Sequence, residues 1–259
     1  MDQVESVSSG ISTGLGVRLV SAKRVGLYST TILNRREAER AVRRACSIAR
    51  VSEPNKEWVS LPLRFGTSPI EGTFDRETAE LRPEALSTKA REMLHAVHVY
   101  SPNLSVTRGM VSVSTEKTTI VNSHGCGLEQ EGSFALAYVS VKAEKDGKKG
   151  LSTESDQSHA WNNLEFLGMC QKASDDALKA VEAKPIPAGE MPVIWRNKLF
   201  ATVLSIMFGG TLSAESVQKK RSPWAGKVGT QITADNINLT DDGLLPRGIG
   251  TRMFDDEGV

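Results

Sequence analysis

Strict alternation of side chains along residues 133–143 constrains the fold of this chain more than any other feature. One set of side chains is small and aliphatic and the other is mostly larger: Ala135, Ala137, Val139 and Val141 against Phe134, Leu136, Tyr138 and Ser140. A period of two is that of a β-strand, whose successive side chains point to opposite faces. Turn-forming sequences flank this strand at residues 122–125 and 145–147, so we expect antiparallel neighbours.

The other expected elements are grouped by type. Strands are expected at residues 12–20, 24–29, 104–114, 117–122, 150–156 and 191–195. Helices are expected after Asn34, after Pro83, over residues 161–183 and over residues 197–208, and residues 51–80 are expected to be an irregular linker. Because strands and helices do not alternate strictly, the pattern favours an α+β fold with antiparallel sheets and packed helices.

Apolar residues at helical spacing mark the faces that we expect to be buried. In the helix after Asn34 they are Ala38, Ala41, Val42, Ala45 and Ile48. In the helix at 161–183 they are Leu164, Leu167, Cys170, Ala177, Leu178 and Val181. The rest of the first helix is rich in arginine, which predicts a solvated face, with a partner-binding or nucleic-acid face as the alternative.

Charge and cysteine content exclude several classes of function. The 259 residues contain 32 Lys and Arg and 31 Asp and Glu, so the net charge of +1 gives no electrostatic basis for binding nucleic acid or an anionic membrane. The most apolar run, residues 199–210, is too short to span a bilayer. The three cysteines are odd in number and far apart, which is typical of reduced thiols in a cytoplasmic protein.

Five local groups of residues are candidates for reactive or metal-binding sites. His95 and His98 are three residues apart on an expected helix and could face one metal ion, but the sequence offers no clear third ligand. His124 and Cys126 could form a nucleophile pair, although a tight turn explains them better. His159 has no evident partner. The carboxylates at residues 241–242 and 255–257 are expected to form turns, with a hard cation site as the alternative. The residues alone therefore predict no active site.

Four longer segments carry a resemblance: GLGVRLVSAKRVGLYST, IVNSHGCGLEQEG, LSAESVQKKRSPWAGKVGTQI and DDGLLPRGIGTRMFDDEGV. From about residue 8 onward the chain resembles the TldD/PmbA family, also called the modulator-of-DNA-gyrase family. The resemblance implies a two-subunit peptidase, in which a TldD subunit binds zinc through an HExxxH helix and a PmbA/TldE subunit keeps the fold without that motif. It further implies three domains, at residues 1–78, 79–187 and 188–259. The first is expected to be incomplete and the last truncated, so that the chain is a fragment or a truncated gene product.

The six positions of HExxxH fall on residues 205–210 of this chain, when counted back from residues 214–217. Ser205 and Gly210 stand at the histidines and Ile206 stands at the glutamate, and none of these side chains can bind zinc or activate water. The resemblance therefore implies a non-catalytic PmbA/TldE-like subunit with no metal or cofactor of its own. Zinc is expected in a TldD-like partner, with self-association as the alternative.

The resemblance also gives candidate residues for binding a peptide substrate: Ser205, Gly209, Gly210, Asp255, Asp256 and Gly258. For each of them, helix packing or turn formation is the alternative explanation. Two other functions stay open at this point. One is a stand-alone binding or regulatory protein without peptidase activity, and the other is a self-sufficient hydrolase that uses Cys126 and His124.

Overall fold

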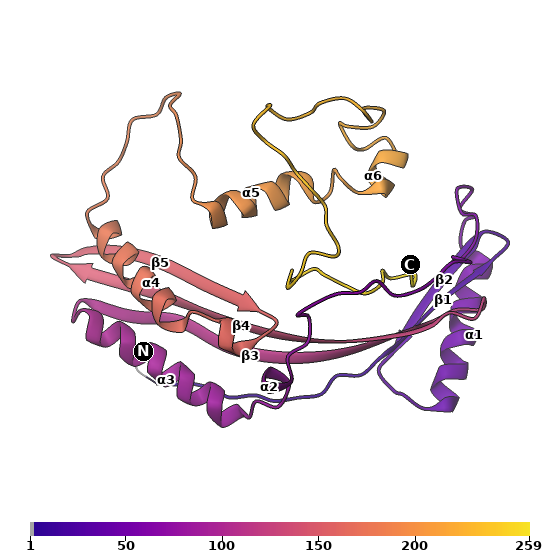
Figure 1. Cartoon of the computed structure of the whole chain (residues 1–259), viewed down its shortest axis with the longest axis horizontal. Helices are drawn as coiled ribbons and strands as arrows, with labels where there is room; N and C mark the ends of the chain where they lie inside the picture. The colour runs from indigo at the N-terminus through magenta and orange to yellow at the C-terminus, as the bar shows by residue number, and fades with distance from the viewer. Residues whose placement is uncertain (1–2) are drawn as a thin grey trace. The chain divides into compact units, whose positions relative to one another are not determined.

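The structure is a computed structural model that describes residues 3–259 (Figure 1). The chain divides into two compact units. The first comprises residues 3–183 together with Asp242–Val259, and the second comprises Lys184–Asp241. Helices pack on antiparallel sheets in the first unit, which confirms the predicted α+β class. The boundaries at residues 78 and 187 stay a prediction.

A hairpin and one helix open the first unit. β1 (Leu15–Ser21) and β2 (Arg24–Thr30) pair antiparallel, as predicted, through a turn in which Ala22 and Lys23 have positive φ angles of 48° and 62°. α1 (Arg35–Val51) follows, and the Asn34 side chain caps it by accepting a hydrogen bond of 2.9 Å from the Glu37 backbone N–H.

The buried face of α1 is narrower than predicted. Ala41, Ala45 and Ala49 are buried against the hairpin, whereas Val42 and Ile48 are exposed. The reason is the close approach of the helix to β2. A methyl group at Gly26 would meet the Ala45 carbonyl oxygen, so only the smallest side chains fit along the line of contact.

The second sheet has three antiparallel strands in the order β3-β4-β5: β3 (Leu104–Val121), β4 (Gly127–Lys145) and β5 (Lys148–Ser158). The prediction of separate strands at 104–114 and 117–122 was wrong, because Glu116 and Lys117 pair with Gly132 and Glu131 and the ladder continues through this polar stretch. The turn at residues 145–147 is confirmed, with positive φ angles at Asp146 (52°) and Gly147 (75°).

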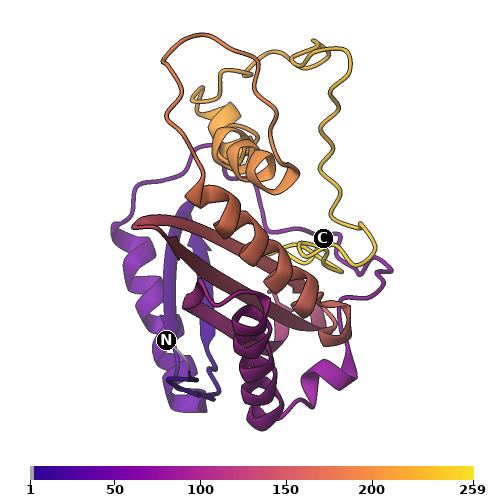
Figure 2. The ribbon, with the colours of Figure 1, turned by 90° about the vertical axis from the view of Figure 1, so that its left-hand side faces the viewer.

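Two helices cover the same face of this sheet (Figure 2). They are α3 (Pro83–Tyr100) and α4 (Phe166–Val181). The helix predicted at 161–183 starts later than expected, because η1 (Trp161–Asn163) precedes it and the Glu165 backbone N–H donates to the Asp156 carboxylate at 3.0 Å. Leu167 of α4, predicted to be buried, is 61% exposed.

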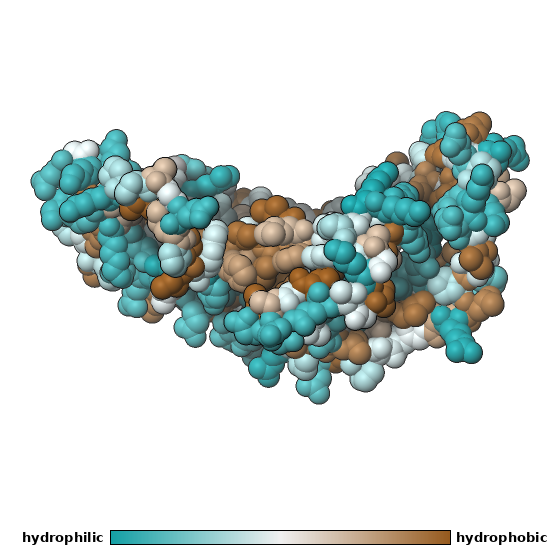
Figure 3. All heavy atoms as spheres, turned by 90° about the horizontal axis from the view of Figure 1, so that it is seen from above, coloured by the Kyte–Doolittle hydropathy of each residue, from teal (hydrophilic) through white to brown (hydrophobic). Residues whose placement is uncertain are grey.

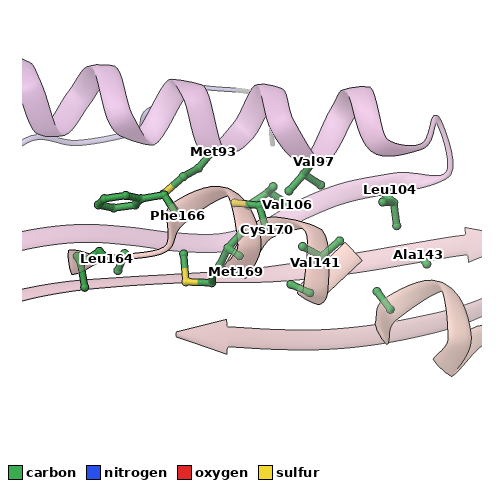
Figure 4. Packing of buried hydrophobic residues seen from close by; sticks show 14 of the residues in the cluster. Met93, Val97, Leu104, Val106, Val141, Ala143, Leu164, Phe166, Met169 and Cys170 are labelled. Carbon is green, nitrogen blue, oxygen red and sulfur yellow. The ribbon is translucent and has the colours of Figure 1, made fainter. Parts of the chain in front are cut away.

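The core lies between these helices and the small residues of β4 (Figure 4). Its buried members are Met93, Val97, Leu104, Val106, Ala135, Ala137, Val139, Val141, Ala143, Leu164, Phe166, Met169, Cys170, Ala173, Ala177 and Val181. The opposite face of β4 carries the larger side chains Phe134, Leu136 and Tyr138, which are half-buried. The alternation in the sequence therefore separates a helix-covered face from a second face that is less completely buried.

The backbone of α4 packs directly against the backbone of β5 at Gly150. A methyl group at Gly150 would meet the Ala177 carbonyl oxygen and lie 2.7 Å from the Val181 backbone nitrogen. Ala173 and Ala177 are fully buried on the same side of α4. A glycine is therefore required at this point of β5 for the helix to reach the sheet.

Residues 242–259, called here the C-terminal strap, return to the first unit after the chain has passed through the second. The backbone N–H groups of Gly66 and Ser68 donate to the carbonyls of Gly258 and Met253 at 3.1 and 2.8 Å. The Arg247 backbone N–H donates to the Glu71 carbonyl at 3.0 Å. The region predicted to be an irregular linker thus holds the strap, and it also contains the short α2 (Arg76–Ala79).

The second unit contains α5 (Asn197–Phe208), as predicted, and α6 (Ala214–Gln218). Its only close aromatic pairs among the described residues are Trp195–Phe200 and the stacked Phe208–Trp224 pair, whose ring centroids are 5.1 Å apart. The strand predicted at 191–195 is absent from the described structure, and Pro192 has no N–H to donate to a ladder.

The surface includes many large apolar side chains among the hydrophilic ones (Figure 3). Several belong to the second unit, in which α5 has no buried residue. Across residues 3–259, no helix combines the length and the apolar character that a bilayer-spanning segment needs.

Replacing Gly150 with Ala should destabilise the first unit by about 1–3 kcal/mol, because the added methyl group collides with the backbone of α4. Gly127→Ala is the matched control, since it lies in the same sheet and a methyl group there meets nothing within 4 Å. Urea denaturation of both variants measures the difference. Equal unfolding midpoints for the two variants would contradict the close approach.

Candidate functional site

The residues that the family resemblance aligns with HExxxH lie at the end of α5 and in the turn after it. Ile206 is 79% exposed, and Ser205 is exposed as well. The Gly209 backbone N–H donates to the Ser205 carbonyl at 2.9 Å, so Gly209 closes the last turn of the helix, and Gly210 follows in open space. No imidazole or carboxylate stands at these positions, and the local hydrogen bonding is that of a helix end.

The acidic candidates form a tight turn in the C-terminal strap. One carboxylate oxygen of Asp255 accepts from the backbone N–H groups of Glu257 and Val259 at 2.9 and 3.0 Å. Gly258 has a φ of 87° and is buried, and a methyl group there would lie 2.8 Å from the Cys126 Sγ. Asp255 and Gly258 thus have structural roles, whereas Asp256 is exposed.

The structure brings Asp255, Asp256 and Gly258 together in one turn, and Ser205, Gly209 and Gly210 together at one helix end. The two groups belong to different units. A role of either group in binding substrate therefore stays a prediction.

The histidines proposed as reactive or metal-binding groups lie in ordinary local structure. Among residues 3–259, no three His, Cys, Asp or Glu side chains gather closely enough to hold a metal ion. His124 is exposed in a turn, in which the Asn122 side chain accepts from the backbone N–H groups of His124 and Cys126 at 2.9 and 3.1 Å. Cys126 is only 3% exposed, which leaves its thiol inaccessible to a substrate. The turn explanation accounts for these contacts.

Cys170 is buried between α4 and the sheet. Burial raises the pKa of its thiol to about 11, because the apolar surroundings disfavour the charged thiolate. The thiolate is the nucleophilic form of cysteine, so this residue is a packing residue rather than a reactive one.

His159 joins two segments that are distant in sequence. Its Nδ1 lies 2.6 Å from the Ser133 carbonyl oxygen and its Nε2 lies 3.0 Å from the Gly248 carbonyl oxygen. The ring thus bridges β4 and the C-terminal strap. Because both acceptors are carbonyls, a neutral ring, which has one N–H, can donate to only one of them at a time.

A pocket of about 240 Å³ opens beside this histidine, between the strap and β3–β4. Its lining comprises Thr73, Ser114, Glu116, Gln130, Gly132, Ser133, Phe134, His159, Ile249, Thr251 and Arg252. We call it the strap pocket. Glu116 and Arg252 form an ion pair at its edge, with 3.3 Å between the carboxylate and the guanidinium. On the opposite face of the same two strands, Glu129 raises the pKa of Lys117, and Lys117 lowers the pKa of Glu129, through a contact of 2.6 Å.

Sequence patterns did not predict the strap pocket. Its residues come from the irregular segment before α2, from β3 and β4, from His159 just after β5 and from the C-terminal strap, and no local spacing links them. One residue could have indicated the pocket: Gln130 is a polar residue inside a long strand, and the structure buries it.

Replacing His159 with Ala should loosen the strap, because Ser133 and Gly248 lose their shared partner. We expect the free energy of unfolding to fall by about 1–3 kcal/mol. We also expect faster hydrogen exchange at the backbone amide of Met253, a strap residue that donates to the Gln130 side chain of β4. Denaturation and hydrogen-exchange mass spectrometry measure the two effects. His95→Ala, on the exposed side of α3, is the control. An unchanged exchange rate at residues 247–253 would contradict the bridging role.

Models of one protein family match most of the chain. They describe PmbA/TldA metallopeptidase domain 1 at residues 1–49, the central domain at 76–181 and the C-terminal domain at 188–259. Among curated sequences, a metalloprotease of Methanocaldococcus jannaschii is 22% identical over 99% of this chain and 57% of its own length. Metalloprotease PmbA of Escherichia coli O157:H7 is 25% identical over 99% of this chain and 57% of its own length.

Solved structures of this family share the fold of the chain. TldE of Thermococcus kodakarensis superposes with a TM-score of 0.82 at 27% identity, over 94% of this chain and 55% of that protein. A protein of Bacteroides thetaiotaomicron described as a modulator of DNA gyrase superposes with a TM-score of 0.84 at 23% identity, over 95% of this chain and 57% of that protein. The chain thus spans a little over half the length of these relatives. With three domain models matched in order and this fold shared, the chain belongs to the TldD/PmbA metallopeptidase family.

Proposed function

We propose that this chain is a PmbA/TldE-like, non-catalytic subunit of a TldD/TldE-type zinc metallopeptidase complex that acts on peptides or unfolded small proteins. One observation carries the proposal. At the positions of the zinc-binding motif the chain has Ser205, Ile206 and Gly210, which supply neither a zinc ligand nor a general base.

The similarity to the Thermococcus TldE structure supports the same subunit type. A subunit of this kind needs a partner that carries the metal, so a TldD-like chain with an intact HExxxH helix is the proposed partner. The proposed location of the complex is the cytoplasm, in keeping with three free cysteines, of which two are buried.

The proposed contribution of this chain is to hold the substrate. β3 and β5 are the outer strands of the three-stranded sheet, and β1 and β2 are both outer strands of the hairpin. An extended peptide can add to such an edge through backbone hydrogen bonds, which suits substrates of varied sequence. The candidate residues Ser205, Gly209, Gly210, Asp255, Asp256 and Gly258 remain part of this proposal.

A stand-alone binding or regulatory protein is the second candidate, suggested by the description of the Bacteroides structure as a modulator of DNA gyrase. It requires no peptidase partner. The two candidates therefore differ in whether the chain forms a complex with a zinc-bearing subunit.

Co-purification with a TldD-like subunit from the same genome tests the proposal. We expect a complex that cleaves an unfolded substrate such as casein, while each chain alone is much less active. Failure of the two chains to associate, with both folded by circular dichroism, would favour the stand-alone candidate.

Metal analysis provides a separate test. The isolated chain should contain far less than one zinc per molecule after dialysis, and the complex should contain zinc in proportion to the TldD-like subunit. Stoichiometric zinc in the isolated chain would contradict the proposal.

A further inference from the structure

We infer that the strap pocket binds a primary carboxamide, the group found at the end of asparagine and glutamine side chains. The chemistry of the pocket is argued from its own residues. The source of the carboxamide in a peptide substrate rests on the proposed function, whereas a free amino acid could supply the same group.

Thr73 provides the first unused hydrogen-bonding group. The residue is 6% exposed, and its backbone carbonyl accepts from the Ser133 N–H at 3.0 Å. Its side-chain hydroxyl, in contrast, has no hydrogen-bond partner within residues 3–259, and the residue lines the pocket. The hydroxyl is not among the fully buried polar atoms that lack a partner, so water or a ligand in the pocket can reach it.

Gln130 provides the second group. It is 8% exposed, and its Oε1 accepts from the Met253 backbone N–H at 2.7 Å. Because an N–H donor must meet the oxygen, this contact fixes the orientation of the amide and leaves the NH2 group as the free end. In the described part of the chain that NH2 group donates to no protein acceptor.

The charges of the lining favour a neutral ligand. Glu116 and Arg252 pair with each other, and both nitrogens of His159 face backbone carbonyls. No unpaired cation is therefore left in the lining to compensate a buried carboxylate, and no unpaired anion is left to compensate an ammonium group. Phe134 and Ile249 add apolar wall, against which a flat amide plane can pack.

The free groups match the two ends of a carboxamide. The ligand carbonyl can accept from the Gln130 NH2, and the ligand NH2 can donate to the Thr73 hydroxyl. The volume of about 240 Å³ equals that of about eight waters at ~30 Å³ each, which suits one side chain and its surrounding water. An apolar side chain of equal size would leave both protein groups unpaired, so the pocket should discriminate against it.

The test is a binding titration of the whole chain with three capped pentapeptides, acetyl-Ala-Ala-X-Ala-Ala-N-methylamide, in which X is Gln, Glu or Leu, so that a primary carboxamide is present only when X is Gln. We expect the Gln peptide to bind about tenfold more tightly than the other two, the size of effect that one or two hydrogen bonds give. Isothermal titration calorimetry or NMR chemical-shift mapping measures this ratio. Free glutamine in a parallel titration distinguishes the two sources: tighter binding of the peptide supports a peptide side chain, and equal or tighter binding of free glutamine supports a free amino acid.

Two variants address the pocket directly. Thr73→Val keeps the shape and removes the hydroxyl, and Gln130→Glu keeps the acceptor for Met253 and removes the NH2 donor. Either should reduce the preference for the Gln peptide about tenfold. Thr119→Val, on the opposite face of β3, should leave it unchanged. The second variant keeps the test decisive if the first fails to fold.

Equal binding of the three peptides, no binding of any, or an unchanged preference in both folded pocket variants would overturn the inference. These results are separable from the proposed function. Association with a TldD-like subunit and the zinc content of the complex can be measured in the same variants, and either inference can fail while the other holds.

Discussion

The backbone contact between α4 and β5 at Gly150 sets the geometry of the main sheet. With no side chain at this position, the helix lies close enough to bury Ala173 and Ala177 completely, and the core can be built from the small residues of β4. The hairpin shows the same kind of contact. The absence of a side chain at Gly26 lets the backbone of α1 and its buried alanines pack closely against β2. Both helix–sheet layers thus depend on a glycine that packs against small helix residues. At each of these contacts an added carbon atom would clash with the helix backbone.

α3 and α4 cover one face of the sheet, and the strap pocket lies on the other. The larger side chains of β4 lie there, and the C-terminal strap crosses the same face of the β3–β4 ribbon farther along. The strap is held by hydrogen bonds to the segment before α2, by His159 and by Gln130. These contacts leave the Thr73 hydroxyl and the Gln130 amide facing a small pocket. The same arrangement that positions the strap therefore creates a site with unused hydrogen-bonding groups.

The sequence predicted the local elements well where one periodicity dominated. The hairpin, the cap at Asn34, the turn at residues 145–147 and the alternation along β4 all follow from side-chain pattern and turn chemistry. It failed where tertiary contacts decide. Glu116 and Lys117 interrupt the apolar pattern of β3, but the hydrogen-bonded pairing of β3 with β4 continues through them. The Glu165 backbone N–H donates to the Asp156 carboxylate, and α4 therefore begins later than the sequence predicted. The strap pocket could not be predicted from the sequence because its residues meet only after five separate segments have packed.

The second unit is inserted between two stretches of the first, since the chain leaves at residue 183 and returns at residue 242. To the first unit, the second is therefore one long closed loop. The entropy of closing a flexible loop rises only with the logarithm of its length, about 0.6 kcal/mol for each doubling. Insertions or deletions within residues 184–241 should thus have little effect on whether the strap docks. In evolutionary terms, this arrangement allows the inserted part to diverge, and with it the motif positions at the end of α5, while the scaffold that carries it stays the same.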